Sequence, residues 1–136
     1  MNAIELAGAE DAARMQICRL AAAPYRTAGR FAFHFADFKL KMDPLFTDIL
    51  LCGALGNCHD LVDLGCGQGL LAAWLDAAGQ AYAQGTWPAT WPAPPTLRRY
   101  RGVDLRIASI ERAKAALGHR GEFRVLDIRR ADLSGA

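Results

Sequence analysis

The spacing of apolar positions changes along the chain, and each spacing predicts a different kind of element. In the first third, apolar residues recur every three or four positions, which predicts helices at Ala9–Ala23, ended by Pro24, and at Thr27–Lys41. Further along, three short apolar runs alternate with helical stretches. The runs predict strands at Asp60–Leu64, Tyr100–Asp104 and Phe123–Asp127. Strand–helix alternation is typical of a parallel sheet with helical crossovers.

The predicted helix Thr27–Lys41 carries two parallel stripes. One stripe is apolar and comprises Phe31, Phe35, Phe38 and Met42. The other stripe is polar and comprises Arg30, His34, Asp37 and Lys41. An amphipathic helix normally lays its apolar stripe against the core, so we expect the Phe/Met stripe to be buried. Asp43 and Pro44 then suit the cap and first position of a third helix.

Three glycines separate the first predicted strand from the next helix, in "LVDLGCGQGLLA". Gly65, Gly67 and Gly69 let the backbone approach a ligand closely at the carboxyl edge of the sheet. The spacing is not the Gly-x-Gly-x-x-Gly of dinucleotide sites. Asp63 also makes a poor neighbour for a diphosphate, and it favours a ligand that carries an amino group. A dinucleotide remains the alternative.

The helix after these glycines is apolar nearly all round, and we expect it to end at Gly79. Residues 80–97 hold four of the six prolines and two of the three tryptophans, which predicts an irregular insertion. It joins a helix end to a strand start, so it should lie at the amino edge of the sheet, opposite the glycines.

Composition narrows the class of protein. A chain of 136 residues with 52% hydrophobic residues suggests one globular domain, and a net charge of +2 implies no nucleic-acid partner. The four cysteines match no usual metal spacing, so we expect reduced thiols, no metal site and a cytoplasmic location. No signal peptide is apparent, and no apolar run is long enough to predict a membrane span.

The glycine stretch closely resembles motif I of the class I S-adenosylmethionine-dependent methyltransferases. "YRGVDL", "FRVLDIR" and the helical lead-in "KMDPLFTDILL" resemble that superfamily in the same order. The resemblance implies an α/β fold with a Rossmann-like parallel sheet, preceded by N-terminal helices. We therefore divide the chain into a helical segment, 1–56, and a partial cofactor-binding domain, 57–136.

The resemblance also implies a site for S-adenosylmethionine. Its residues would be Asp63, Gly65, Cys66, Gly67, Gly69, Asp104, Leu105, Asp127 and Ile128. Asp63 and the turn backbone would surround the methionine part, and Asp104 would accept hydrogen bonds from the ribose hydroxyls. Asp127 would accept from the adenine amino group. Each acid after a strand has an alternative role, which is to cap the helix that follows.

The function implied is methyl transfer to a small-molecule substrate. Only three strands of an expected seven are present, so we expect the front half of such a domain, with no catalytic base that can be named. The first strand would then be an open edge, through which two copies could pair as a homodimer. The alternatives are a non-catalytic cofactor-binding or interaction module derived from this fold, and a fragment of a nucleotide-dependent oxidoreductase.

Overall fold

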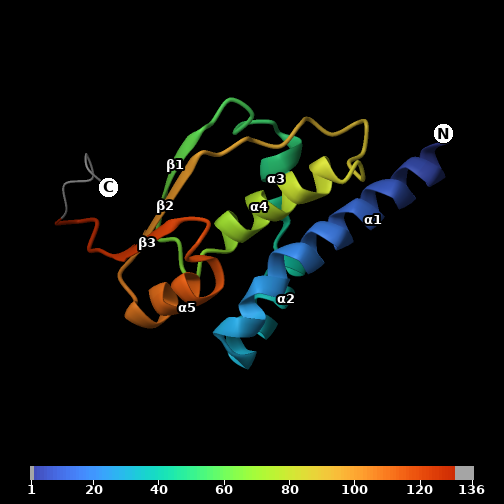
Figure 1. The fold of residues 1–136 in the computed structure, drawn as a ribbon. Helices are drawn as coiled ribbons and strands as arrows, with labels where there is room; N and C mark the ends of the chain where they lie inside the picture. The colour runs from blue at the N-terminus through green and yellow to red at the C-terminus, as the bar shows by residue number, and fades with distance from the viewer. Residues whose placement is uncertain (1, 131–136) are drawn as a thin grey trace.

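Three parallel strands form the sheet, and their order in space is the order along the chain, β1-β2-β3. The computed structural model describes residues 2–130 (Figure 1). Its elements are α1 (Ala3–Ala22), the 3₁₀ helix η1 (Ala23–Ala28), α2 (Arg30–Met42), α3 (Pro44–Leu51), β1 (Asp60–Leu64), α4 (Leu70–Ala83), β2 (Arg99–Asp104), α5 (Ile107–Leu117) and β3 (Glu122–Val125). The α/β class with a three-stranded parallel sheet is therefore confirmed, and its strands match the expected ones to within two residues.

The helices lie on one side of the sheet, as Figure 1 shows. Tyr100 and Phe123 point from β2 and β3 into that covered side and are buried. On the other face the side chains of Val62, Leu64 and Arg124 are exposed. Within the described residues β1 is an edge of the sheet, because it pairs with β2 alone.

The N-terminal helices start and stop at different places from those expected. Helix α1 begins six residues earlier than predicted, because Asn2 and Glu5 form a capping box. Pro24 does not end the helical path, since the chain continues through it as η1. Helix α2 begins after Gly29, whose φ of 110° breaks the helical backbone, and not at Thr27.

One hydrophobic core runs through both halves of the sequence. Ile17, Tyr25 and Leu40 from the N-terminal helices are fully buried in the same cluster as Trp74 of α4. Phe46 of α3 packs on Trp74 with 5.8 Å between ring centroids. Residues 2–56 thus provide the layer that covers α4 and, through it, the sheet.

The expected burial of the Phe/Met stripe on α2 is wrong. Phe31, Phe38 and Met42 are each 64–66% exposed, and Phe35 is 44% exposed. The buried face of α2 is instead formed by Ala32, Ala36 and Leu40. The small alanines let α2 approach α1 and α4 closely, and Leu40 fills the space that remains. Helical periodicity identified which residues share a face, but it did not identify which face meets the core.

Two local predictions about the following helices had different outcomes. Asp43 caps α3 through a hydrogen bond from the Leu45 N–H, and Pro44 occupies the first position, as predicted. Gly79 does not end α4, which continues to Ala83. The insertion therefore begins with the last turn of α4, and its irregular part covers residues 84–98.

The Pro/Trp segment packs at the amino edge of the sheet, as its topology predicts. The backbone of Arg98 donates to the carbonyl of His59, which directly precedes β1, and the His59 ring lies 3.0 Å from the carbonyl oxygen of Thr96. Trp91 is only 8% exposed and packs edge-on against Trp87. The segment is thus a covering layer for the core at this edge.

Candidate functional site

The glycine turn is held to the end of β2 by backbone hydrogen bonds. The N–H groups of Gly65 and Cys66 both donate to the carbonyl of Val103, at 2.8 and 2.9 Å. Gly69 then donates to the carbonyl of Cys66, and α4 begins at the next residue. The turn therefore lies at the carboxyl edge of β1 and β2, where parallel sheets bind their ligands.

The three glycines share a left-handed backbone but have different surroundings. Gly65, Gly67 and Gly69 have φ values of 74°, 58° and 88°, which disfavour any other residue. A side chain at Gly69 would meet Leu117 and Phe123 at 3.1 Å, so this glycine serves packing between α4 and its neighbours. A side chain at Gly65 or Gly67 would meet nothing within 4 Å. Open space beside these two backbones is what a ligand in close contact with them requires.

Asp104 joins the end of β2 to the glycine turn. Its Oδ2 accepts from the Gly67 N–H at 2.8 Å, and its Oδ1 accepts from the Arg106 N–H at 2.8 Å. The second bond stabilises the entry into α5, so the capping alternative describes part of its role. A carboxylate offers about four acceptor positions, so capacity remains for two donors from a ligand.

Asp63 lies behind the turn on β1 and pairs in register with Gly102. Its Oδ2 accepts a hydrogen bond from the hydroxyl of Tyr100. Burial raises the pKa of Asp63, the Tyr100 hydrogen bond opposes that rise, and the charge of Asp104 adds to it. Asp63 is therefore a partly buried carboxylate whose ionised form depends on nearby donors.

Cys66 fills the space under the turn. Its side chain is 8% exposed, and its sulfur would stand 2.8 Å from a side chain at Gly102. Burial, together with the charges of the nearby carboxylates of Asp63 and Asp104, raises the pKa of the Cys66 thiol to about 12. A thiol that stays protonated is a poor nucleophile, so Cys66 acts here as a packing residue.

The third acid lies beyond its strand. Asp127 follows the last residue of β3 by two positions, so the predicted strand end at Asp127 is wrong. Both its carboxylate oxygens accept hydrogen bonds from Arg129, which lowers the pKa of Asp127. Leu105 and Ile128, which follow two of the three acids, are 62% and 44% exposed and offer apolar surface.

Two residues that the sequence did not identify tie the turn to the N-terminal helices. The hydroxyl of Tyr25 donates to the carbonyl of Gln68 at 2.8 Å, and the buried Gln68 amide donates to the carbonyl of Ala32 at 3.0 Å. These partners are 43 and 36 residues apart, and no local pattern links them. The turn is thus held from the sheet side and from η1 and α2.

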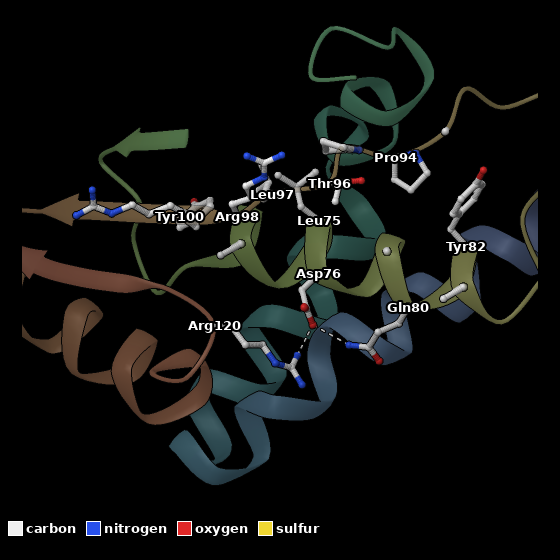
Figure 2. Close-up of a pocket in the computed structure, with 16 residues that line it drawn as sticks. Leu75, Asp76, Gln80, Tyr82, Pro94, Thr96, Leu97, Arg98, Tyr100 and Arg120 are labelled. Atoms are coloured by element: carbon white, nitrogen blue, oxygen red, sulfur yellow. Dashed lines mark hydrogen bonds and ion pairs between the residues drawn. The ribbon is translucent and has the colours of Figure 1, made fainter. Parts of the chain in front are cut away.

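A groove lies elsewhere, at the amino edge of the sheet (Figure 2). It has a volume of about 660 Å³ and runs between α4 and the Pro/Trp segment. Asp76 stands in it, accepting hydrogen bonds from Gln80 and Arg120. Its charged group therefore already has hydrogen-bond partners within the protein.

No family model, curated protein or solved structure matches this chain. Among residues 2–130, no three side chains of His, Cys, Asp or Glu gather as metal ligands would. In the same part of the chain, no helix has the length and apolar character needed to cross a bilayer. The case for a function therefore depends on the geometry of the glycine turn.

Proposed function

We propose that this chain forms the S-adenosylmethionine-binding part of a methyltransferase that acts on a small molecule. The observation that carries the proposal is the hydrogen bond from Gly67 to Asp104. It brings the two parts of the expected site together, a turn with open space beside its backbone and an acid suited to ribose hydroxyls.

The residues present fit this cofactor better than a dinucleotide. Asp63 adds a carboxylate behind the turn, where it would oppose a diphosphate and favour an ammonium group. The exposed side chains of Leu105 and Ile128 suit the faces of an adenine ring. Near-neutral net charge favours a small acceptor over a nucleic acid.

When bound, the cofactor supplies an electrophilic methyl group on a positively charged sulfur. The chain's own contribution is positioning, which accounts for a large part of the rate in such bimolecular steps. Gly65 and Gly67 let the backbone come close, and Asp104 fixes the ribose. The charge of Asp63 would orient the amino group. None of these residues is assigned the role of a base that takes a proton from the acceptor.

Binding measurements with three ligands test the class of cofactor. The chain should bind S-adenosylhomocysteine, the demethylated product, and should not bind NAD or ATP at comparable concentrations. Tighter binding of NAD would favour the oxidoreductase alternative. Binding of S-adenosylhomocysteine without methyl transfer to a panel of small nucleophiles would favour the non-catalytic module. Absence of binding to all three ligands, with an intact fold, would overturn the proposal.

A further inference from the structure

Asp63 and Tyr100 form an acid–phenol pair behind the glycine turn, and no motif in the sequence assigns a role to the phenol. Tyr100 is 4% exposed on β2, and its hydroxyl donates to Oδ2 of Asp63 on β1. This is the only hydrogen bond made by the Asp63 side chain within residues 2–130. The second oxygen, Oδ1, is therefore free to accept a hydrogen bond from a ligand.

The strand register creates this pair. Tyr100 stands opposite Leu61, and Gly102 stands opposite Asp63, so the tyrosine and the acid lie two positions apart on the same face. Gly102 has no side chain between them. An added side chain there would meet Cys66 at 2.8 Å and Phe123 at 2.9 Å, so the packing allows only glycine at this position.

The other ionisable groups around Asp63 do not stabilise its charge. Asp104 at the end of β2 is another acid, and its charge favours the protonated form of Asp63. Cys66 on the turn and Tyr25 on η1, the remaining neighbours of this pair, are neutral groups whose pKa values are raised by burial. Burial and the charge of Asp104 both favour the protonated form of Asp63, and the hydrogen bond from the Tyr100 hydroxyl favours the ionised form.

We propose that Tyr100 is a positioning residue, whose hydroxyl holds Asp63 ionised and oriented so that Oδ1 can accept from an ammonium group of the ligand. The inference rests on the proposed function for the identity of that ligand. It goes further by assigning a second residue, on another strand, to recognition of the amino group. It also predicts a dependence on pH that a purely structural tyrosine would not produce.

The direct test is the Tyr100→Phe variant, which removes one hydroxyl and keeps the ring. The Asp63 carboxyl, followed by carbon NMR in the ligand-free protein, should titrate about one to two pH units higher than in the wild type. The control is Tyr82→Phe, because Tyr82 is an exposed tyrosine on α4 whose hydroxyl makes no hydrogen bond in the described chain. It should leave the midpoint unchanged.

Ligand binding provides the second measurement. In Tyr100→Phe, affinity for S-adenosylhomocysteine should fall about five- to tenfold more than in the wild type when the pH is lowered to about one unit below the new midpoint. An analogue without the amino group should show no such difference. If Tyr100→Phe does not fold, Asp63→Asn serves instead, and it should weaken the amino-bearing ligand while sparing the analogue.

The outcomes separate this inference from the proposed function. A raised Asp63 midpoint without binding of either ligand would support the role of Tyr100 and overturn the cofactor assignment. Binding of S-adenosylhomocysteine with an unmoved Asp63 midpoint in a folded Tyr100→Phe protein would overturn the role of Tyr100. In the Asp63→Asn variant, equal affinity changes for both ligands would also overturn it.

Discussion

The carboxylate of Asp104 accepts a hydrogen bond from the backbone N–H of Gly67, at 2.8 Å and across 37 residues of sequence. The bond joins the glycine turn after β1 to the end of β2. It gives the turn a fixed shape before any ligand arrives, which lowers the entropic cost of binding. Preorganisation of this kind is expected of a site that binds through backbone contacts.

Replacement of Asp104 by Ala should therefore lower both the affinity for the ligand and the stability of the fold. Affinity for S-adenosylhomocysteine should fall by about 1.5–3 kcal/mol, the scale of hydrogen bonds to a charged group. The free energy of unfolding should fall by about 1 kcal/mol for each of the two backbone bonds lost. Calorimetry and urea unfolding measure the two effects separately.

Asp104→Asn is the matched control, since it keeps an acceptor oxygen and the size of the side chain. Its single acceptor oxygen can keep one of the two backbone hydrogen bonds, so it should lose about half as much stability as Asp104→Ala and still lose affinity. Unchanged affinity in Asp104→Ala, together with reduced stability, would show that Asp104 only caps the entry to α5.

The Pro/Trp segment should affect stability and leave ligand binding unchanged. Trp91→Ala should lower the free energy of unfolding by about 3 kcal/mol, because the indole is buried. Affinity for S-adenosylhomocysteine should stay within about threefold, because the segment lies at the amino edge. A tenfold loss of affinity with an unchanged circular dichroism spectrum would show that the segment reaches the ligand.

The two faces of α2 should respond to substitution in opposite ways. Phe38→Ser should change the free energy of unfolding by less than about 0.5 kcal/mol, as at other exposed positions. Leu40→Ala should cost about 2–5 kcal/mol, because Leu40 is fully buried. Thermal or urea unfolding measures both. A larger cost for Phe38 than for Leu40 would show that the Phe/Met stripe is buried in solution.

Stability should fall at alkaline pH. The folded state keeps Cys66 protonated up to a pKa of about 12, whereas the same thiol ionises near 9 in the unfolded chain. Between these values the folded state binds more protons than the unfolded chain. The stability contributed by the protonated thiol is therefore complete below about pH 9 and is lost as the pH rises toward 12.

Urea unfolding at about pH 8 and pH 11 measures this loss. Cys66→Ala should reduce the difference between the two pH values, because the alanine has no proton to lose. The remaining difference should come from Cys18, Tyr25 and Tyr100, whose pKa values burial also raises. An equal pH dependence in wild type and Cys66→Ala would contradict the burial of the thiol in solution.

Local sequence patterns predicted the parts of the fold that local physics determines. Strand β1, the glycine turn and the Asp43 cap depend on alternation, backbone freedom and short-range hydrogen bonds. The end of α4 was misplaced because Gly79 is compatible with a helix interior when nothing else breaks the helix there. Its missing side chain leaves open space in the groove beside α4.

Features that depend on contacts between distant residues were not predictable in the same way. The Phe/Met stripe on α2 faces solvent because Ala32 and Ala36, on the other face, pack more closely than phenylalanines could. Periodicity shows which residues share a face, but it does not show which of the two faces packs better against the core. The sequence alone identifies Tyr100 only as part of a strand. Its role beside Asp63 follows from the register of β1 and β2, which no single segment specifies.

The most direct measurement is calorimetric titration of S-adenosylhomocysteine into the wild type and two valine variants. Gly67→Val and Gly85→Val place the same side chain at left-handed positions, with φ of 58° and 77°, and both positions have open space around them. The backbone strain is therefore similar, but only Gly67 belongs to the proposed site. Binding should be lost in Gly67→Val and equal to wild type in Gly85→Val. Unchanged affinity in a folded Gly67→Val protein, or no binding to the wild type, would contradict the proposal that the glycine turn holds S-adenosylmethionine.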